Sequence, residues 1–109
     1  LYSATGASSN IFAGATTLSL NTWYMCSLVI NRSAGQQILY INASTERTDA
    51  ITTESTNHTG PAGIGFIIGA GSSGTQPLAA RIGYGLVYNR TLTATEIGNI
   101  YNYTKTRFS

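Results

Sequence analysis

The sequence predicts an all-β protein, a sandwich of antiparallel sheets with one short C-terminal helix. Three observations predict it. Short apolar runs alternate with polar residues and are separated by stretches rich in Gly, Ser, Thr and Asn. Helical spacing of apolar residues occurs convincingly only near the C-terminus. Charged residues make up 9% of the 109 residues, whereas hydrophobic residues make up 42%, which is enough for a core and excludes a disordered chain.

The helix is predicted from its start signals. Thr93 has the character of an N-cap, and Glu96 stands at the position that completes a capping box, in which each side chain satisfies the backbone N–H of the other residue. Leu92 and Ile97 occupy the two positions of a hydrophobic staple. The apolar stripe that follows consists of Ile97, Ile100 and Tyr101.

The strands are predicted from period-two alternation. The predicted strands are Thr16–Leu20, Trp23–Asn31, Gln37–Asn42, Thr45–Ile51, Ala62–Gly69 and Leu78–Tyr88. In the second of these, the face that we expect in the core carries Tyr24, Cys26, Leu28 and Ile30.

Two details of these strands are also predicted. We expect Trp23 in the core, and we expect Cys26 to be a small buried hydrophobe with no disulfide partner. Ala tolerates a positive φ poorly, so the turn after Ile41 is expected to widen to Asn42-Ala43-Ser44. Tyr84, Tyr88 and Tyr101 are expected to pack the helix onto the sheet.

A family resemblance lies in the last third of the chain. The run from Ile82 to Ile97 resembles the end of a laminin-G-like, concanavalin A-like jelly-roll domain, in which the last strand enters a Tyr-Asn-Arg-x-Leu-[Ser/Thr]-x-x-Glu-Ile corner. Trp23 opens a strand as in that family, and Leu39 to Ala43 resembles its Leu-Tyr-Val-Asn-Gly hairpin. The corner and cap residues are Tyr88, Asn89, Arg90, Leu92, Thr93, Glu96 and Ile97.

The resemblance has further implications. The ending Asn-Tyr-x-x-x-Lys-x-Arg-Phe, residues 102–108, most resembles versions in structural and appendage proteins of tailed phages. The resembled domains are longer, so we expect residues 1–109 to form a single domain that is the C-terminal part of a larger one. Calcium is used by some relatives, but Gly83 and Tyr84 stand where the family often has an acidic pair. We therefore expect no metal and no other cofactor.

Catalysis is not expected, because the chain has few groups for it. The four carboxylates are Glu46, Asp49, Glu54 and Glu96, and Glu96 is assigned to the helix cap. Glu46 and Asp49 are three residues apart on a strand, which places them on opposite faces. A glycoside hydrolase needs two carboxyl groups facing each other across a sugar. His58 has no second His beside it and is interpreted as a solvated loop residue.

Recognition is the expected role, since loops at the ends of a sandwich carry it. The candidate ligand-binding residues are Asn57, His58, Ser72, Ser73 and Gln76. Six basic residues scattered along a chain of net charge +2 disfavour nucleic acid, and no apolar run is long enough for membrane insertion. Asn-x-Ser/Thr acceptor patterns for N-glycosylation occur at Asn31, Asn42, Asn57, Asn89 and Asn102, which we interpret as turn residues.

These observations predict a non-catalytic module displayed on a virion or another extracellular surface. Its partners are expected to be a glycan, in an adhesion role, or neighbouring protein subunits in a homo-oligomeric assembly. Two alternatives remain open at this point. One is a purely structural capsid-decoration or fibre domain, in which the glycine-rich face of residues 63–69 packs on neighbours. The other is an accessory part of a secreted glycosidase or a bacterial surface protein.

Overall fold

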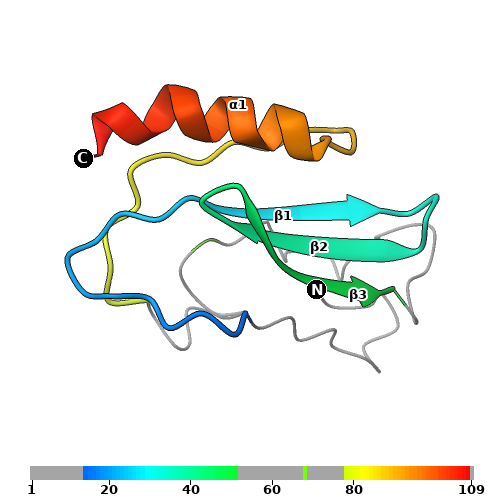
Figure 1. Ribbon diagram of the computed structural model, residues 1–109, viewed down its shortest axis with the longest axis horizontal. Helices are drawn as coiled ribbons and strands as arrows, with labels where there is room; N and C mark the ends of the chain where they lie inside the picture. Colours follow the sequence, from blue (N-terminus) through cyan, green and yellow to red (C-terminus); the bar gives the residue numbers. More distant parts are fainter. Residues whose placement is uncertain (1–13, 52–67, 69–77, 109) are drawn as a thin grey trace, which may run out of the picture. The chain divides into compact units, whose positions relative to one another are not determined.

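The computed structural model describes residues 14–51, 68 and 78–108. The chain divides into two compact units. One comprises Leu1–Asn10 and Thr53–Val87, and the other comprises Ile11–Thr52 and Tyr88–Ser109. The helix and strands labelled in Figure 1 all belong to the second unit. Most of the strand predicted at Ala62–Gly69, and the loops on either side of it, lie outside the described residues.

The second unit contains an antiparallel three-stranded sheet in the order β1-β2-β3. Its strands are β1 (Cys26–Asn31), β2 (Gln36–Ile41) and β3 (Ser44–Ala50). β1 pairs with β2 from Cys26 opposite Ile41 to Asn31 opposite Gln36. These strands match three of the predicted ones, although β1 begins three residues later than the pattern indicates.

The turn between β1 and β2 is stabilised by the side chain of Asn31. Its Oδ1 accepts hydrogen bonds from Ser33 Oγ at 2.8 Å and from the backbone N–H of Ala34 at 3.1 Å. Gly35 has a φ of 61°, a left-handed conformation that Gly adopts without steric cost. Asn and Gly thus supply the turn chemistry that the sequence of this loop indicates.

The turn between β2 and β3 contradicts the predicted widening. Ile41 pairs directly with Ser44, so Asn42 and Ala43 alone make the turn, and their φ values are 50° and 65°. Positive φ at both central residues is what a type I′ hairpin requires. Two hydrogen bonds between Asn42 and Met25 hold this geometry. The N–H of Asn42 donates to the carbonyl of Met25 at 2.9 Å, and the N–H of Met25 donates to Asn42 Oδ1 at 3.0 Å. These hydrogen bonds to Met25 therefore offset the steric cost of a positive φ at Ala43.

A β-bulge lies in β3. Leu39 pairs with Arg47 and Tyr40 pairs with Thr45, so Glu46 is the extra residue on the longer side. The bulge releases Glu46 from the ladder. Its carboxylate instead accepts from the N–H of Thr16 at 2.6 Å and from Thr16 Oγ1 at 2.7 Å. The bulge therefore ties the segment before β1 to the sheet.

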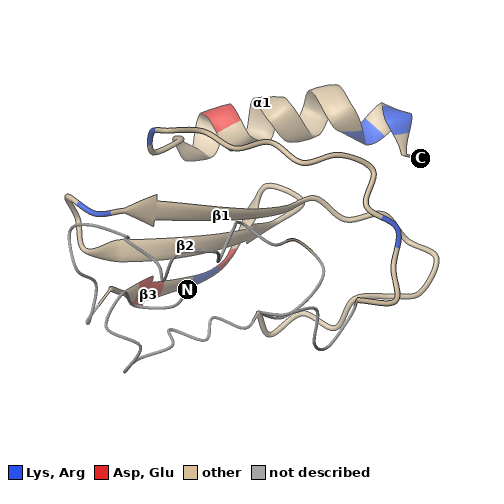
Figure 2. Cartoon of the chain, turned by 180° about the vertical axis from the view of Figure 1, so that it is seen from behind, with Lys and Arg blue, Asp and Glu red and all other residues tan. Residues whose placement is uncertain are grey.

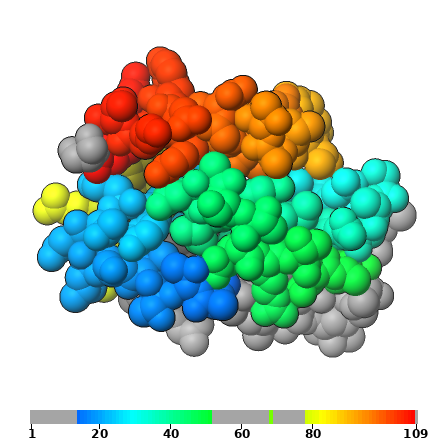
Figure 3. Space-filling model, viewed as in Figure 1, coloured from blue at the N-terminus to red at the C-terminus, as the bar shows by residue number. Residues whose placement is uncertain are grey.

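The C-terminal helix α1 (Ala94–Thr104) is followed by the 3₁₀ turn η2 (Lys105–Arg107). Ile97 of α1 is 1% exposed and forms the core with Val29 (7%) of β1 and Tyr40 (5%) of β2. The half-buried residues packed against this core are Met25, Ile38, Ala43 and Leu92. In the space-filling view, side chains of the helix rest on those of β1 and β2 (Figure 3). No helix among the described residues is long and apolar enough to cross a membrane.

The buried face of β1 is the opposite of the predicted one. Val29 is in the core and Met25 packs against it, whereas Leu28 and Cys26 are exposed. The reason is that α1 covers the face that carries Val29. Period-two alternation separates the two faces of a strand, but it does not say which one a distant helix will cover.

Trp23 is also placed differently from the prediction. It precedes β1, is 44% exposed, and its ring lies 4.9 Å from that of Phe108 at an interplanar angle of 44°. Its contact is therefore with the end of the chain, and the core of this unit is formed by smaller side chains. Tyr84 and Tyr88 are 40% and 46% exposed, and the buried contact between α1 and the sheet is made by Ile97.

Two predicted strands do not form. Thr16–Leu20 is irregular up to a turn at Leu20 and Asn21. Leu78–Tyr88 has strong alternation in sequence but adopts no strand, and every residue in it is exposed. A strand needs a neighbour for its backbone groups, and alternation alone does not supply one. Within the described residues, no strand pairs with this segment.

Candidate functional site

The five predicted ligand-binding residues, Asn57, His58, Ser72, Ser73 and Gln76, lie outside the described residues. The polar and aromatic constellations that the structure does describe are at the corner that leads into α1, in the hairpin turns, and at the far end of the helix.

Glu96 is the centre of the corner. Arg90 donates two hydrogen bonds to its carboxylate, Nη2 to Oε1 at 2.7 Å and Nη1 to Oε2 at 3.0 Å. The N–H of Thr93 donates to Oε2 at 2.8 Å, and Thr93 Oγ1 accepts from the N–H of Glu96 at 3.2 Å. Both hydrogen bonds expected of a capping box are therefore present. The bidentate Arg90 contact fixes the approach to the helix as well as its first turn.

The partnership of Arg90 with Glu96 was missed by sequence reasoning. The corner motif placed Arg90 beside the helix start without giving it a role. A signal for it is nevertheless present, since an arginine shortly before a capping glutamate supplies the planar donor fork that a carboxylate accepts.

The charge of Glu96 is stabilised by these contacts. The guanidinium of Arg90 is the largest influence, followed by the N–H of Thr93, and together they lower the pKa of Glu96 from 4.5 to about 2. Hydrogen bonding to Glu96 raises the pKa of Arg90 in turn. The pair is thus fully charged across the physiological range.

A pH dependence follows from the lowered pKa of Glu96. A carboxyl with a lower pKa in the folded state stabilises that state above its unfolded pKa, and this contribution is lost as pH falls through the folded pKa. We expect the urea concentration at the midpoint of unfolding to decrease as the pH is lowered from about 4.5 to about 2. The variant Glu96→Gln should have a lower midpoint at pH 7 and a shallower fall below pH 4.5. Parallel curves for the two proteins would contradict the assignment.

The other described carboxylates also have structural partners. Glu46 is held by Thr16, whose two donors lower its pKa. Asp49 forms an ion pair with Arg47 at 2.8 Å. Within the described part of the chain, no three His, Cys, Asp or Glu residues lie close enough together to hold a metal ion. Glu54 is outside that part.

The asparagines of the acceptor patterns have defined environments, apart from Asn57, which is not described. Asn31 and Asn42 use their Oδ1 atoms in the turns, and Asn89 is exposed before the corner. Asn102 lies within α1, so its interpretation as a turn residue was wrong. Its Oδ1 accepts from Lys105 Nζ at 2.9 Å.

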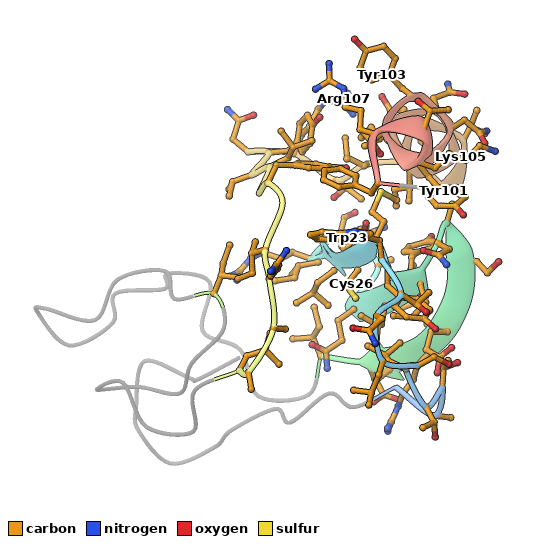
Figure 4. The ribbon with its side chains drawn as sticks, turned by 90° about the vertical axis from the view of Figure 1, so that its left-hand side faces the viewer. Trp23, Cys26, Tyr101, Tyr103, Lys105 and Arg107 are labelled. Carbon is orange, nitrogen blue, oxygen red and sulfur yellow. The ribbon has the colours of Figure 1, made fainter. Side chains whose placement is uncertain are left out.

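Two cation–aromatic pairs lie at the end of the helix. Lys105 Nζ is 5.5 Å from the ring centre of Tyr101, and the guanidinium of Arg107 is 5.7 Å from that of Tyr103. Figure 4 shows that Tyr103 and Arg107 lie on the side of the helix away from Trp23, whereas Tyr101 and Lys105 project from another side. These pairs were not predicted from the sequence, although their i, i+4 spacing at the end of a helix is a signal for them.

Cys26 differs from its prediction, because its side chain is exposed. Partial desolvation still raises the pKa of its thiol. A raised pKa reduces the thiolate fraction at neutral pH, so the residue lacks the environment of a nucleophilic cysteine.

Comparisons with known proteins agree with this architecture. A search of curated protein sequences found no match. Among solved structures, the chain is similar to an S-layer domain-containing protein from Clostridium thermocellum (residues 221–444), with a TM-score of 0.62 and 18% identity. The match covers 81% of this chain and 43% of that one, so the chain spans less than half of it. Residues 1–98 match the family model described as the concanavalin A-like lectin/glucanases superfamily, and the chain therefore belongs to that superfamily.

Proposed function

We propose that this chain is a non-catalytic, glycan-binding module of a protein displayed on a cell surface or a virion. Membership of a superfamily that contains lectins and glucanases supports a role in handling carbohydrate. Lectins bind carbohydrate and glucanases hydrolyse it, and the chemistry of the described residues favours binding over hydrolysis.

The observation that carries the proposal is the engagement of the described carboxylates. Glu46 accepts from Thr16, Asp49 pairs with Arg47, and Glu96 is held by Arg90 and Thr93. A glycosidase needs one carboxyl group able to donate a proton and a second able to attack or to activate water. A carboxylate with a lowered pKa is a poor proton donor at neutral pH, which applies to Glu46 and Glu96.

The finer features of the proposal rest on the family resemblance. We propose that the three described strands form part of a complete jelly-roll sandwich. The ending Asn-Tyr-x-x-x-Lys-x-Arg-Phe supports a place in a tailed-phage appendage, and the likeness in fold to a domain of an S-layer domain-containing protein is compatible with a bacterial surface.

A glycan array followed by a hydrolysis assay tests the proposal. We expect the protein to retain one or more cell-surface glycans on the array, and to release no reducing ends from them during prolonged incubation. Release of reducing ends would contradict the non-catalytic role. Absence of binding to every glycan would contradict the recognition role.

A second function, assembly with further copies of this chain, is favoured by one observation. The run Ile82–Tyr88 keeps its apolar side chains exposed, and Val87 is 76% exposed. Exposed apolar runs of this kind often mark interaction surfaces. Sedimentation velocity over a hundredfold range of concentration distinguishes this function, because it predicts self-association that Val87→Ser weakens. A monomer at every concentration would remove it.

A further inference from the structure

The outer face of the C-terminal end of α1 presents an aromatic ring beneath a cation. Tyr103 is 72% exposed even though the guanidinium of Arg107 lies 5.7 Å from its ring centre. Figure 4 shows both side chains on the side of the helix away from Trp23. The ring is therefore open to solvent, while the guanidinium lies over one of its faces and is held there by cation–π attraction.

A third polar group lies on the same face. Asn99 is exposed and precedes Tyr103 by four residues, as Tyr103 precedes Arg107. Residues four apart on a helix are neighbours about 5–6 Å apart. Asn99, Tyr103 and Arg107, which we call the outer stripe, thus place an amide, an aromatic ring and a guanidinium in a row. Amides bind hydroxyl groups, aromatic rings stack on the apolar faces of sugars, and a guanidinium binds carboxylates.

The charge along the helix favours an anion at this end. Glu96 is the acidic residue of α1 and lies in its first turn, paired with Arg90, while Lys105 and Arg107 follow the last turn (Figure 2). Within the described part of the chain, no carboxylate pairs with Arg107. The full positive charge of Arg107 exceeds the roughly half negative charge of a helix C-terminus, whereas Lys105 donates to Asn102 Oδ1.

We infer that the outer stripe binds an acidic polysaccharide whose charge is the carboxylate of a uronic acid, an inference that rests on the proposed glycan-binding function. Tyr103 stacks on a sugar ring, Arg107 donates to the carboxylate of that sugar or its neighbour, and the amide of Asn99 binds a hydroxyl one residue along the polymer. One guanidinium beside an open ring suits a polymer with about one charge per sugar, because each carboxylate then lies next to a sugar ring that Tyr103 can contact.

Titration of the protein with oligogalacturonate, followed by calorimetry, tests this inference. We expect Arg107→Ala and Tyr103→Ala each to weaken binding about fivefold, the scale of an exposed ion pair or an aromatic contact. Lys105→Ala is the matched control, because it removes the same charge from another side of the helix. It should weaken binding less than about twofold. Circular dichroism and thermal melting verify that each variant remains folded.

The outcomes separate this inference from the proposed function. The outer stripe would not be the binding site if the unaltered protein failed to bind oligogalacturonate, or if Arg107→Ala and Lys105→Ala had equal effects. If neutral oligosaccharides are still bound, the general glycan-binding function stands without it. Tighter binding of a sulfated polymer than of oligogalacturonate would show that the carboxylate assignment is wrong.

Discussion

Replacement of Ile97 by alanine is expected to lower the free energy of unfolding by about 2–5 kcal/mol. Ile97 is 1% exposed and is the one residue of α1 that belongs to the core with Val29 and Tyr40. Removal of its side chain leaves a cavity where the helix contacts the sheet, and the cost rises with the volume that the neighbouring side chains do not fill. Urea unfolding monitored by circular dichroism measures the loss.

The matched control for this variant is Leu20→Ala. Leu20 is also a large aliphatic residue but is 91% exposed, so its truncation should change stability by less than about 0.5 kcal/mol. A similar loss in both variants would indicate a general effect of removing apolar atoms. A loss below about 1 kcal/mol for Ile97→Ala would contradict the core described above.

Replacement of Asn42 by alanine is expected to cost about 2–5 kcal/mol, from two separate causes. The N–H of Met25, now bonded to Asn42 Oδ1, loses its partner, which costs about 1–3 kcal/mol for a group shielded from water. Alanine must also adopt the positive φ of this position, at a cost of about 1–2 kcal/mol. Denaturant unfolding gives the total.

Two further variants separate these causes. Asn42→Asp keeps an acceptor oxygen and tolerates a positive φ, so it should retain most of the stability. Asn42→Gly adopts the turn without strain but loses the acceptor, so it should lie between Asp and Ala. If Ala and Asp were equally stable, the hydrogen bond to Met25 would have no energetic role.

The features that sequence predicted well are those encoded within a few residues. The start of α1 follows from Thr93 and Glu96, whose hydrogen bonds are local. The pairing of β1 with β2 follows from two alternating runs separated by a short Asn- and Gly-containing turn. Both depend on contacts between residues close in sequence, and such contacts leave a readable pattern.

The features that sequence missed depend on distant partners. Val29 is buried because α1, more than sixty residues later, covers its face of the sheet. The hairpin turn at Ala43 stays tight because Asn42 bonds to Met25, which lies before β1. The candidate site shows the same division. Arg107 lies beyond the apolar stripe that predicts the helix, so its pairing with Tyr103 became evident only from the continuation of α1 into η2.

The claim on which the account most depends is that α1 packs on the sheet through Ile97, which fixes the outer stripe on the opposite side of the helix. Methyl NOE spectroscopy on the protein tests it most directly. The account predicts NOEs from the methyl groups of Ile97 to the methyls of Val29 and to the ring of Tyr40. NOEs from Ile97 confined to its own helix, with Val29 and Tyr40 in contact with other segments, would contradict it.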